Sequence, residues 1–352
     1  MLAYVLGWGA WLLPPVTFKL EQDCKVRLRQ YRKKLDDTVR DAGLLFALIP
    51  FITTITSLTP PLIRWLGNTG TPAYASPAAN IVTIQKQPAT CDFPQTQSES
   101  FARCAAFSID FSTQDTGDIN RNIFNVFSGQ TGVNKEQQLY VDNPENIQVE
   151  NGALVLRALH RPDSQYQYTS ARIDTRGKAD FLYGKLVVRA KMPLGSGVWP
   201  AIWLLPSESK YANQGVSGYP RHVIDGEIDV AETAGSEPNV LYGVAHTLDY
   251  YHRNRDPAYF GTMLVPDSHT AFHDYSLEWT PDSIRISIDD VVYFTYTKKQ
   301  SADYRTWPFD QPFYLIINVA LGGTWVGNID NNALPATMEI QNIRYYPYIG
   351  QE

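Results

Sequence analysis

The sequence predicts an all-β fold, either a sandwich or a barrel of many short strands. In residues 185–192, apolar and charged side chains alternate with a period of two, which is the pattern of a half-buried strand. Residues 284–288 alternate in the same way, and the turn Asp289-Asp290 then leads into the apolar run 291–294, which predicts a hairpin. The last two thirds of the chain show no long helical period, and no internal repeat indicates a propeller.

The first 75 residues differ in composition from the rest of the chain. Residues 25–34 carry six basic side chains and no acidic one, and the apolar run 43–52 follows them. Residues 73–75 then have the small-x-small pattern of a signal cleavage site. A second apolar run, residues 1–18, precedes the basic segment, and both runs are short for a membrane-spanning helix. We therefore expect residues 1–75 to be an export signal or a membrane anchor, which would make the protein secreted, periplasmic or attached to the cell surface.

Residues 76–100 are rich in Pro, Thr, Ser, Gln and Ala, so we expect a linker there. Residues 101–352 are expected to form the folded domain. Its clearest expected strands are residues 153–158, which follow the turn Asn151-Gly152, and residues 185–192, 284–288, 291–294, 313–321 and 338–346. Cys91 and Cys104 would close a short loop in an oxidising compartment, although their spacing alone does not establish a disulfide.

Composition and charge narrow the class of partner. The chain of 352 residues has a net charge of -6, which argues against nucleic acid, because a phosphate-binding surface needs a basic excess. It is rich in Tyr and Trp and contains only 19% charged residues, which suits a neutral carbohydrate polymer, although most aromatic side chains belong to a core. No cluster of Cys and His residues indicates a zinc site. We expect a monomer.

Three acids fall within one short segment, at Glu227, Asp229 and Glu232. Side chains alternate between the two faces of a strand, so Glu227 and Asp229 share a face and Glu232 would point to the other. A bulge of one residue at Val230-Ala231 would bring all three acids to one face and bend the strand. The residues between the acids are apolar, so the opposite face suits a core, and the acids would line the concave side of a curved sheet.

This arrangement suits the hydrolysis of a glycosidic bond with retention of configuration. That reaction needs one carboxylate as nucleophile and one carboxylic acid as proton donor. Two carboxyl groups close together cannot both ionise easily, so the pKa of one rises and it stays protonated near neutral pH. Taken alone, an acidic triplet on a strand is more often a solvated face or a set of calcium ligands.

The segment 227–232 resembles the signature of glycoside hydrolase family 16 in its bulged form, and further segments match that family in order over about residues 120–346. These further segments are residues 136–140, 169–173, 183–185, 192–206, 245–247, 272–275, 278–279 and 318–323. The resemblance implies that residues 101–352 are a catalytic domain folded as a β-jelly-roll sandwich, with two curved antiparallel sheets and a concave substrate cleft. Residues 107–112 match the start of the family domain only loosely.

The resemblance also implies roles for individual residues. Glu227 corresponds to the nucleophile, Glu232 to the general acid/base and Asp229 to the assisting acid between them. The implied contacts with substrate are Trp199, Trp203, Arg172, His246, Asn134, Glu136 and Trp325. The chemistry would need no cofactor, and the sequence leaves a structural calcium ion open.

The substrate implied by the resemblance is a β-glucan. The bulged motif points away from the xyloglucan-modifying branch, and residues 199–203 look most like those of laminarinases, so we expect endo-hydrolysis of β-1,3-glucan and of mixed-linkage β-1,3-1,4-glucan. Asp225 stands where lichenase-type relatives have Trp, which weakens a strict mixed-linkage assignment. The alternatives are a hydrolase of algal galactans (agarase or carrageenase type), a glucan transglycosylase, and a non-catalytic β-glucan-binding lectin.

Overall fold

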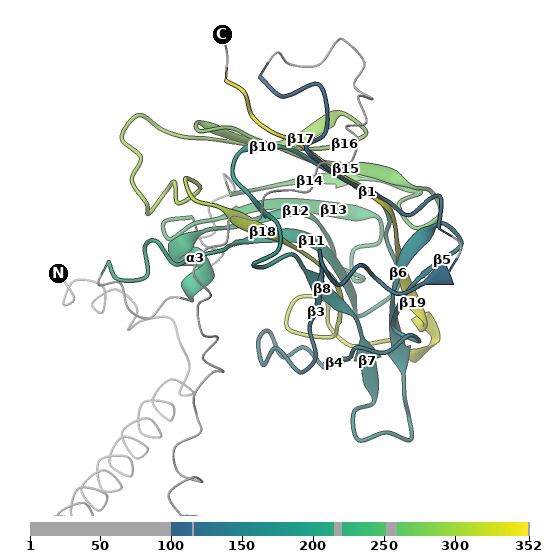
Figure 1. Cartoon of the computed structure of the whole chain (residues 1–352). Helices are drawn as coiled ribbons and strands as arrows, with labels where there is room; N and C mark the ends of the chain where they lie inside the picture. The colour runs from purple at the N-terminus through teal and green to yellow at the C-terminus, as the bar shows by residue number, and fades with distance from the viewer. Residues whose placement is uncertain (1–99, 115, 215–219, 251–258, 351–352) are drawn as a thin grey trace, which may run out of the picture. The chain divides into compact units, whose positions relative to one another are not determined.

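The computed structural model describes residues 100–350 except 115, 215–219 and 251–258, and all of these belong to one compact unit, residues 77–352. Within this unit two large β-sheets lie one over the other (Figure 1). We call the 11-stranded sheet the outer sheet and the 8-stranded sheet the inner sheet. Pairing in both is antiparallel, apart from one short parallel pair, β4 with β7.

The outer sheet contains, in spatial order, β17 (Val291–Thr297), β16 (Ser283–Ile288), β15 (His273–Trp279), β10 (Gly184–Lys191), β19 (Ala336–Tyr346), β6 (Ala153–His160), β5 (Ile147–Glu150) and β2 (Thr116–Gly117). Beside this path, β1 (Phe107–Asp110) pairs with β19, and β7 (Tyr168–Ser170) pairs with β6 and with β4 (Leu139–Tyr140).

The inner sheet contains, in spatial order, β14 (Phe260–Leu264), β13 (Val240–His246), β12 (Glu227–Thr233), β11 (Val198–Pro206), β18 (Phe313–Leu321), β8 (Arg172–Asp174) and β3 (Asn125–Val126), while β9 (Asp180–Phe181) pairs with β18. Helical structure in the described part of the chain includes α3 (Arg221–Asp225) and the 3-10 turn η3 (Asn331–Ala333). Consecutive strands pass repeatedly between the sheets, as from β10 to β11 and from β17 to β18, which makes the fold a jelly-roll sandwich.

The core lies between the two sheets. All nine residues of β18 are buried, which is the pattern of a central strand covered on both faces. On β12 the side chains of Ile228 and Ala231 enter the main apolar cluster, together with Ile202 of β11 and Ile286 of β16. The inner sheet therefore packs against the outer sheet through one face, while its other face carries partly buried side chains such as Glu227 and Glu232 of β12.

The expected strands form where the side-chain pattern placed them. Residues 313–321 coincide with β18, and residues 153–158, 185–192 and 338–346 lie in β6, β10 and β19 with shifts of one or two residues at the ends. The expected hairpin joins β16 to β17, and its turn residues Asp289 and Asp290 have φ values of 45° and 65°. These values are typical of a tight hairpin turn.

Lys185 departs from the alternation expected on its strand. Its side chain is only 4% exposed, although the period of two placed it with the outward charges. The ammonium group lies 3.3 Å from Glu278, its register partner on β15, and 3.4 Å from Asp290 in the adjacent hairpin turn. A buried ammonium is tolerated when carboxylates stand beside it, so neighbours distant in sequence decided its burial.

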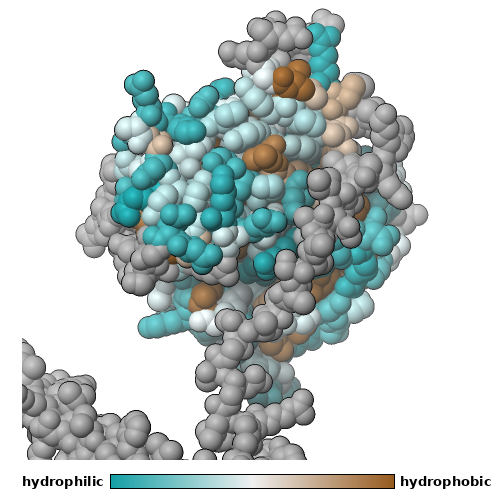
Figure 2. All heavy atoms as spheres, turned by 60° about the vertical axis from the view of Figure 1, so that its left-hand side comes forward, coloured by the Kyte–Doolittle hydropathy of each residue, from teal (hydrophilic) through white to brown (hydrophobic). Residues whose placement is uncertain are grey.

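Several expectations concern residues outside the described part of the chain. The export signal or anchor (1–75) and all but the last residue of the linker (76–100) are among them. Cys104 is disulfide-bonded, but Cys91 lies outside the described residues, so their pairing stays a prediction. Among the described residues, no helix has the length and apolar character needed to cross a bilayer. The face shown in Figure 2 is mainly hydrophilic, with separate apolar patches.

Candidate active site

Strand β12 contains the expected bulge. Toward β13, Asp229 faces Val244 and Glu232 faces Tyr242, so three steps along β12 match two steps along β13. Toward β11, Asp229 faces Trp203 and Ala231 faces Ile202, so Val230 has no register partner on that side. The extra residue thus lies at Val230-Ala231, as the parity of the acids predicted.

The bulge brings the three acids to the same face of the inner sheet. The Glu227 side chain is 15% exposed, that of Asp229 is 2% exposed, and Glu232 is partly buried. The apolar residues between them, Ile228 and Ala231, are fully buried on the core side. Without the extra residue the period of two would turn Glu232 into that core.

Burial raises the pKa of all three carboxyl groups. For Glu227 the pKa lies well above its usual range, because burial and the charge of Asp229 both oppose ionisation. Burial raises the pKa of Asp229 to about 8, and a hydrogen bond with Glu227 partly offsets this rise. Burial and the charge of Asp229 raise the pKa of Glu232 to about 8. The cluster therefore retains protons at neutral pH and shares them among its members.

Two imidazole rings face the two carboxylate oxygens of Glu227. His246, the register partner of Glu227 on β13, places Nε2 3.9 Å from Glu227 Oε1 and 3.1 Å from Asp229 Oδ2. His222 of α3 places Nε2 4.0 Å from Glu227 Oε2, and its side chain is 38% exposed. The imidazole of His246 acts in the opposite direction to burial and lowers the pKa of Glu227. Because Glu227 is also more exposed than Asp229, we assign the charge of this coupled pair to Glu227, against the burial and the charge of Asp229 that raise its pKa.

The two expected tryptophans of β11 lie on the same face as the acids. Trp199 donates from Nε1 to Glu232 Oε1 at 2.9 Å, which fixes the carboxyl group and lowers its pKa. Trp203 donates from Nε1 to Asn318 Oδ1 at 2.7 Å. The guanidinium carbon of Arg172 lies 5.0 Å from the centre of the Trp203 ring, within range of a cation–π contact. Arg172 is also the register partner of Asn318, so these three side chains form one cluster.

The remaining expected residues gather beside Trp199. Trp325 packs edge-to-face on Trp199, with ring centres 5.2 Å apart. The segment with Asn134 and Glu136 lies against the two glycines that precede Trp325. Glu136 forms an isolated β-bridge with Gly322. A Cβ on Gly323 would be 3.0 Å from the Asn134 carbonyl oxygen and 3.8 Å from the Trp199 ring. Asn134 is exposed, and Glu136 accepts hydrogen bonds from Thr131 and Gln138. Of the ten expected site residues, three are the acids themselves, His246 thus contacts Glu227 and Asp229 directly, and the other six form two clusters beside them.

Sequence reasoning missed three residues of this site: His222, Asn318 and Tyr242. Tyr242 shares a strand face with His246, and its ring packs edge-to-face on Trp325 at 5.1 Å. A period of two counted back from His246 would have found it. Asn318 lies in a segment that resembles the family, but that segment gives no sign of its hydrogen bond to Trp203. His222 faces Glu227 only because α3 folds back before β12, and no local pattern indicates this.

A cation could be held by part of the same cluster. Ligand atoms of Glu227, Asp229 and His246 lie within 4.8 Å of one another. Metal binding requires deprotonated carboxylates, whereas burial raises the pKa of both acids in this set. The residues therefore suit proton sharing better than a metal centre. The structural calcium ion left open by the sequence is a separate question, and it stays a prediction.

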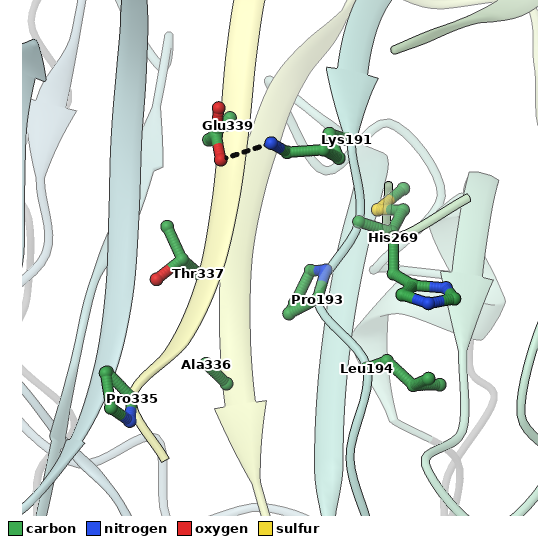
Figure 3. A pocket seen from close by; sticks show the side chains of 9 residues that line it. Lys191, Pro193, Leu194, His269, Pro335, Ala336, Thr337 and Glu339 are labelled. Carbon is green, nitrogen blue, oxygen red and sulfur yellow. Dashed lines mark ion pairs between the residues drawn. The ribbon is translucent and has the colours of Figure 1, made fainter. Parts of the chain in front are cut away.

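A separate pocket of about 260 Å³ lies at the end of β10 and the start of β19 (Figure 3). Its walls include Pro193, Leu194, His269 and the ion pair of Lys191 with Glu339, whose charged atoms are 2.6 Å apart. None of the three acids lines it. The pocket is therefore not the candidate active site.

Comparison with known proteins identifies the family of this chain. Residues 128–340 match the glycosyl hydrolases family 16. The chain is 41% identical over 223 residues to a beta-glucanase of Rhodothermus marinus, covering 61% of this chain and 76% of that protein. The solved laminarinase of Rhodothermus marinus superposes with a TM-score of 0.65 at 37% identity, covering 71% of this chain and 98% of that one. The structure of SCLam, a non-specific endo-beta-1,3(4)-glucanase, has a TM-score of 0.63 at 32% identity and covers 73% and 94% of the two chains. The chain belongs to glycosyl hydrolase family 16.

Proposed function

We propose that this chain is a retaining endo-glycosidase that hydrolyses β-1,3-glucan of the laminarin type and, as a second substrate, mixed-linkage β-1,3-1,4-glucan. The observation that carries the proposal is the bulge in β12, which brings Glu227, Asp229 and Glu232 to one face with raised pKa values. The names of its relatives, laminarinase and endo-beta-1,3(4)-glucanase, support the choice of polymer.

In the first step Glu232 donates its proton to the glycosidic oxygen while Glu227 attacks the anomeric carbon. The bond from that carbon to the leaving sugar breaks, and a covalent glycosyl–enzyme ester forms. In the second step Glu232, now ionised, removes a proton from water, which displaces Glu227 and releases the sugar with net retention. A pKa of about 8 keeps Glu232 protonated at neutral pH, as the first step requires.

Asp229 and His246 prepare the nucleophile. Asp229 is more deeply buried than Glu227, so it is the better holder of the proton that the pair shares. In the reactive state proposed here Asp229 holds this proton and donates a hydrogen bond to ionised Glu227, although the hydrogen bond between the two groups by itself lowers the pKa of Asp229 and raises that of Glu227. The contact of His246 Nε2 with Asp229 at 3.1 Å limits the directions in which this carboxyl group can turn.

The sugar ring is held by the aromatic clusters on either side of the acids. Trp199, Trp325 and Tyr242 lie beside Glu232, on the side of the leaving group. Trp203 and Arg172 lie beside Asp229 and contribute an aromatic face next to a charged donor. Asn134 and Glu136 supply polar groups at the edge near Trp199.

The test uses Glu227→Gln and Glu232→Ala against laminarin, lichenan, agarose and carrageenan. We expect wild-type protein to release short reducing oligosaccharides from laminarin and lichenan with retained anomeric configuration, read by proton NMR. Glu227→Gln should abolish release, and azide should restore turnover of an activated aryl glycoside only in Glu232→Ala. Near-normal hydrolysis by Glu227→Gln would contradict the assignment. Cleavage of agarose or carrageenan alone, or lengthened products, would instead favour the galactanase or the transglycosylase.

We also propose that residues 1–75 export or tether this domain, that the domain acts as a monomer, and that the chemistry needs no metal. The charge and apolar pattern of that segment supports the first point. The raised pKa values of the acids, which disfavour metal binding, support the last. Cell fractionation with an antibody to the domain tests export, light scattering tests the oligomeric state, and activity after EDTA treatment tests the need for metal.

A further inference from the structure

The bulge in β12 interrupts the register with both neighbouring strands. Val230 has no register partner on β11 or on β13. It is also buried, with 1% exposure. A buried carbonyl group needs a hydrogen-bond donor, and at a bulge a side chain from outside the sheet can supply one.

The donor comes from the outer sheet. Tyr293 of β17 donates from its hydroxyl group to the Val230 carbonyl oxygen at 2.7 Å. This hydrogen bond joins the two sheets at the residue that moves Glu232 onto the face of the other acids. Burial raises the pKa of Tyr293 well above 10, so the phenol keeps its proton and remains a donor.

A pair of glycines makes room for the ring of Tyr293 and for the backbone of its strand. Gly243 on β13 and Gly261 on β14 are register partners. A Cβ on Gly243 would lie 2.9 Å from Tyr293 Cε2 and 3.2 Å from its hydroxyl oxygen, and one on Gly261 would lie 2.3 Å from the Tyr293 carbonyl oxygen. Neither glycine has a positive φ, so space rather than backbone conformation requires glycine here.

We propose that Tyr293 is a positioning residue for Glu232: its hydroxyl group holds the Val230 carbonyl and thereby fixes the bulge that aims Glu232 at the glycosidic oxygen. The inference rests on the proposed function, in which Glu232 supplies the proton to the leaving group. Loss of the hydroxyl group should therefore impair proton donation more than nucleophilic attack by Glu227, which lies before the bulge.

Two substrates separate these effects. During laminarin hydrolysis the departing sugar must be protonated. With a dinitrophenyl β-laminaribioside as substrate, the departing dinitrophenolate needs no proton. We expect Tyr293→Phe to lower kcat/KM on laminarin at least tenfold and to change kcat/KM on the dinitrophenyl substrate by less than threefold, with KM for laminarin nearly constant. Gly243→Ala, whose added Cβ crowds the Tyr293 ring, should give the same selective loss if Tyr293→Phe proves unstable.

The matched control is Tyr296→Phe, because Tyr296 lies on the same strand and donates to a different backbone carbonyl, that of Thr306. This variant should leave unchanged the ratio of kcat/KM on laminarin to kcat/KM on the dinitrophenyl substrate. Equal losses on both substrates in Tyr293→Phe, or a ratio like that of Tyr296→Phe, would reduce Tyr293 to a structural role and overturn the inference. Glu232→Ala must itself lower the ratio; if it does not, the proposed role of Glu232 fails, whatever Tyr293 does.

Discussion

Replacing Glu232 by Gln should stabilise the fold at neutral pH while abolishing hydrolysis. The pKa of this carboxyl group is raised from 4.5 to about 8 by folding. At pH 7 the unfolded carboxyl group has lost its proton and the folded one has kept it, so folding must take up a proton. One pKa unit corresponds to about 1.4 kcal/mol, which gives a cost of about 3 kcal/mol over the interval from 4.5 to pH 7.

The amide of Gln is neutral in both states and avoids this cost. Its oxygen can still accept the hydrogen bond from Trp199 Nε1, which is 2.9 Å long in the wild type. Solvent relaxation and proton sharing with Asp229 reduce the gain, so we expect an increase of about 1–3 kcal/mol in the free energy of unfolding. For a domain of this size that corresponds to a rise in Tm of about 2–10 °C.

The sign of this effect can be tested from how the difference in Tm between wild type and variant changes with pH. Below pH 4.5 the Glu232 carboxyl is protonated in both the folded and the unfolded state, so wild type and Glu232→Gln should have the same Tm. As pH rises from 4.5 to about 8 the wild type loses stability relative to the variant, and above about 8 the difference should stay constant. Differential scanning calorimetry between pH 4 and 9 measures this, with Glu208→Gln, at an exposed position, as control. Equal Tm values at pH 7, or a difference that does not vary with pH, would refute the reasoning.

Two further predictions concern the same carboxyl group. Trp199→Phe removes the indole donor that lowers the pKa of Glu232, so the basic limb of the pH profile of kcat/KM should move to higher pH by about 0.5–1 unit. A basic limb at the same or a lower pH would contradict this prediction. Trp203→Phe is the control, because the Trp203 indole donates to Asn318 instead. Deletion of Val230 removes the extra residue of the bulge and should turn Glu232 toward the core, with a loss of laminarin hydrolysis of about a thousandfold or more. Retained activity in a folded deletion variant, checked by circular dichroism, would show that the bulge is dispensable.

Much of the outer sheet, and the acids of the inner sheet, could be predicted from residues close in sequence. The period of two assigns side chains to faces within a strand, so it correctly predicts a strand at residues 185–192 and a hairpin of strands 284–288 and 291–294. The same period exposed the mismatch of Glu232 and predicted the bulge at Val230-Ala231, which the strand register confirms. These features depend on local backbone geometry, which the order of residues specifies directly.

The tertiary structure decided which side chains from distant parts of the chain lie against each face of a strand. Lys185 is buried because Glu278 and Asp290 stand beside it, and His222 faces Glu227 because α3 folds back before β12. Tyr293 reaches the bulge from the other sheet, across a pair of glycines distant from it in sequence. The raised pKa values of the acids have the same origin, since they arise from burial and from neighbours brought together by folding. The sequence by itself determined the strands, the three acids and the need for a bulge, and only long-range packing determined what holds that bulge and where the protons reside.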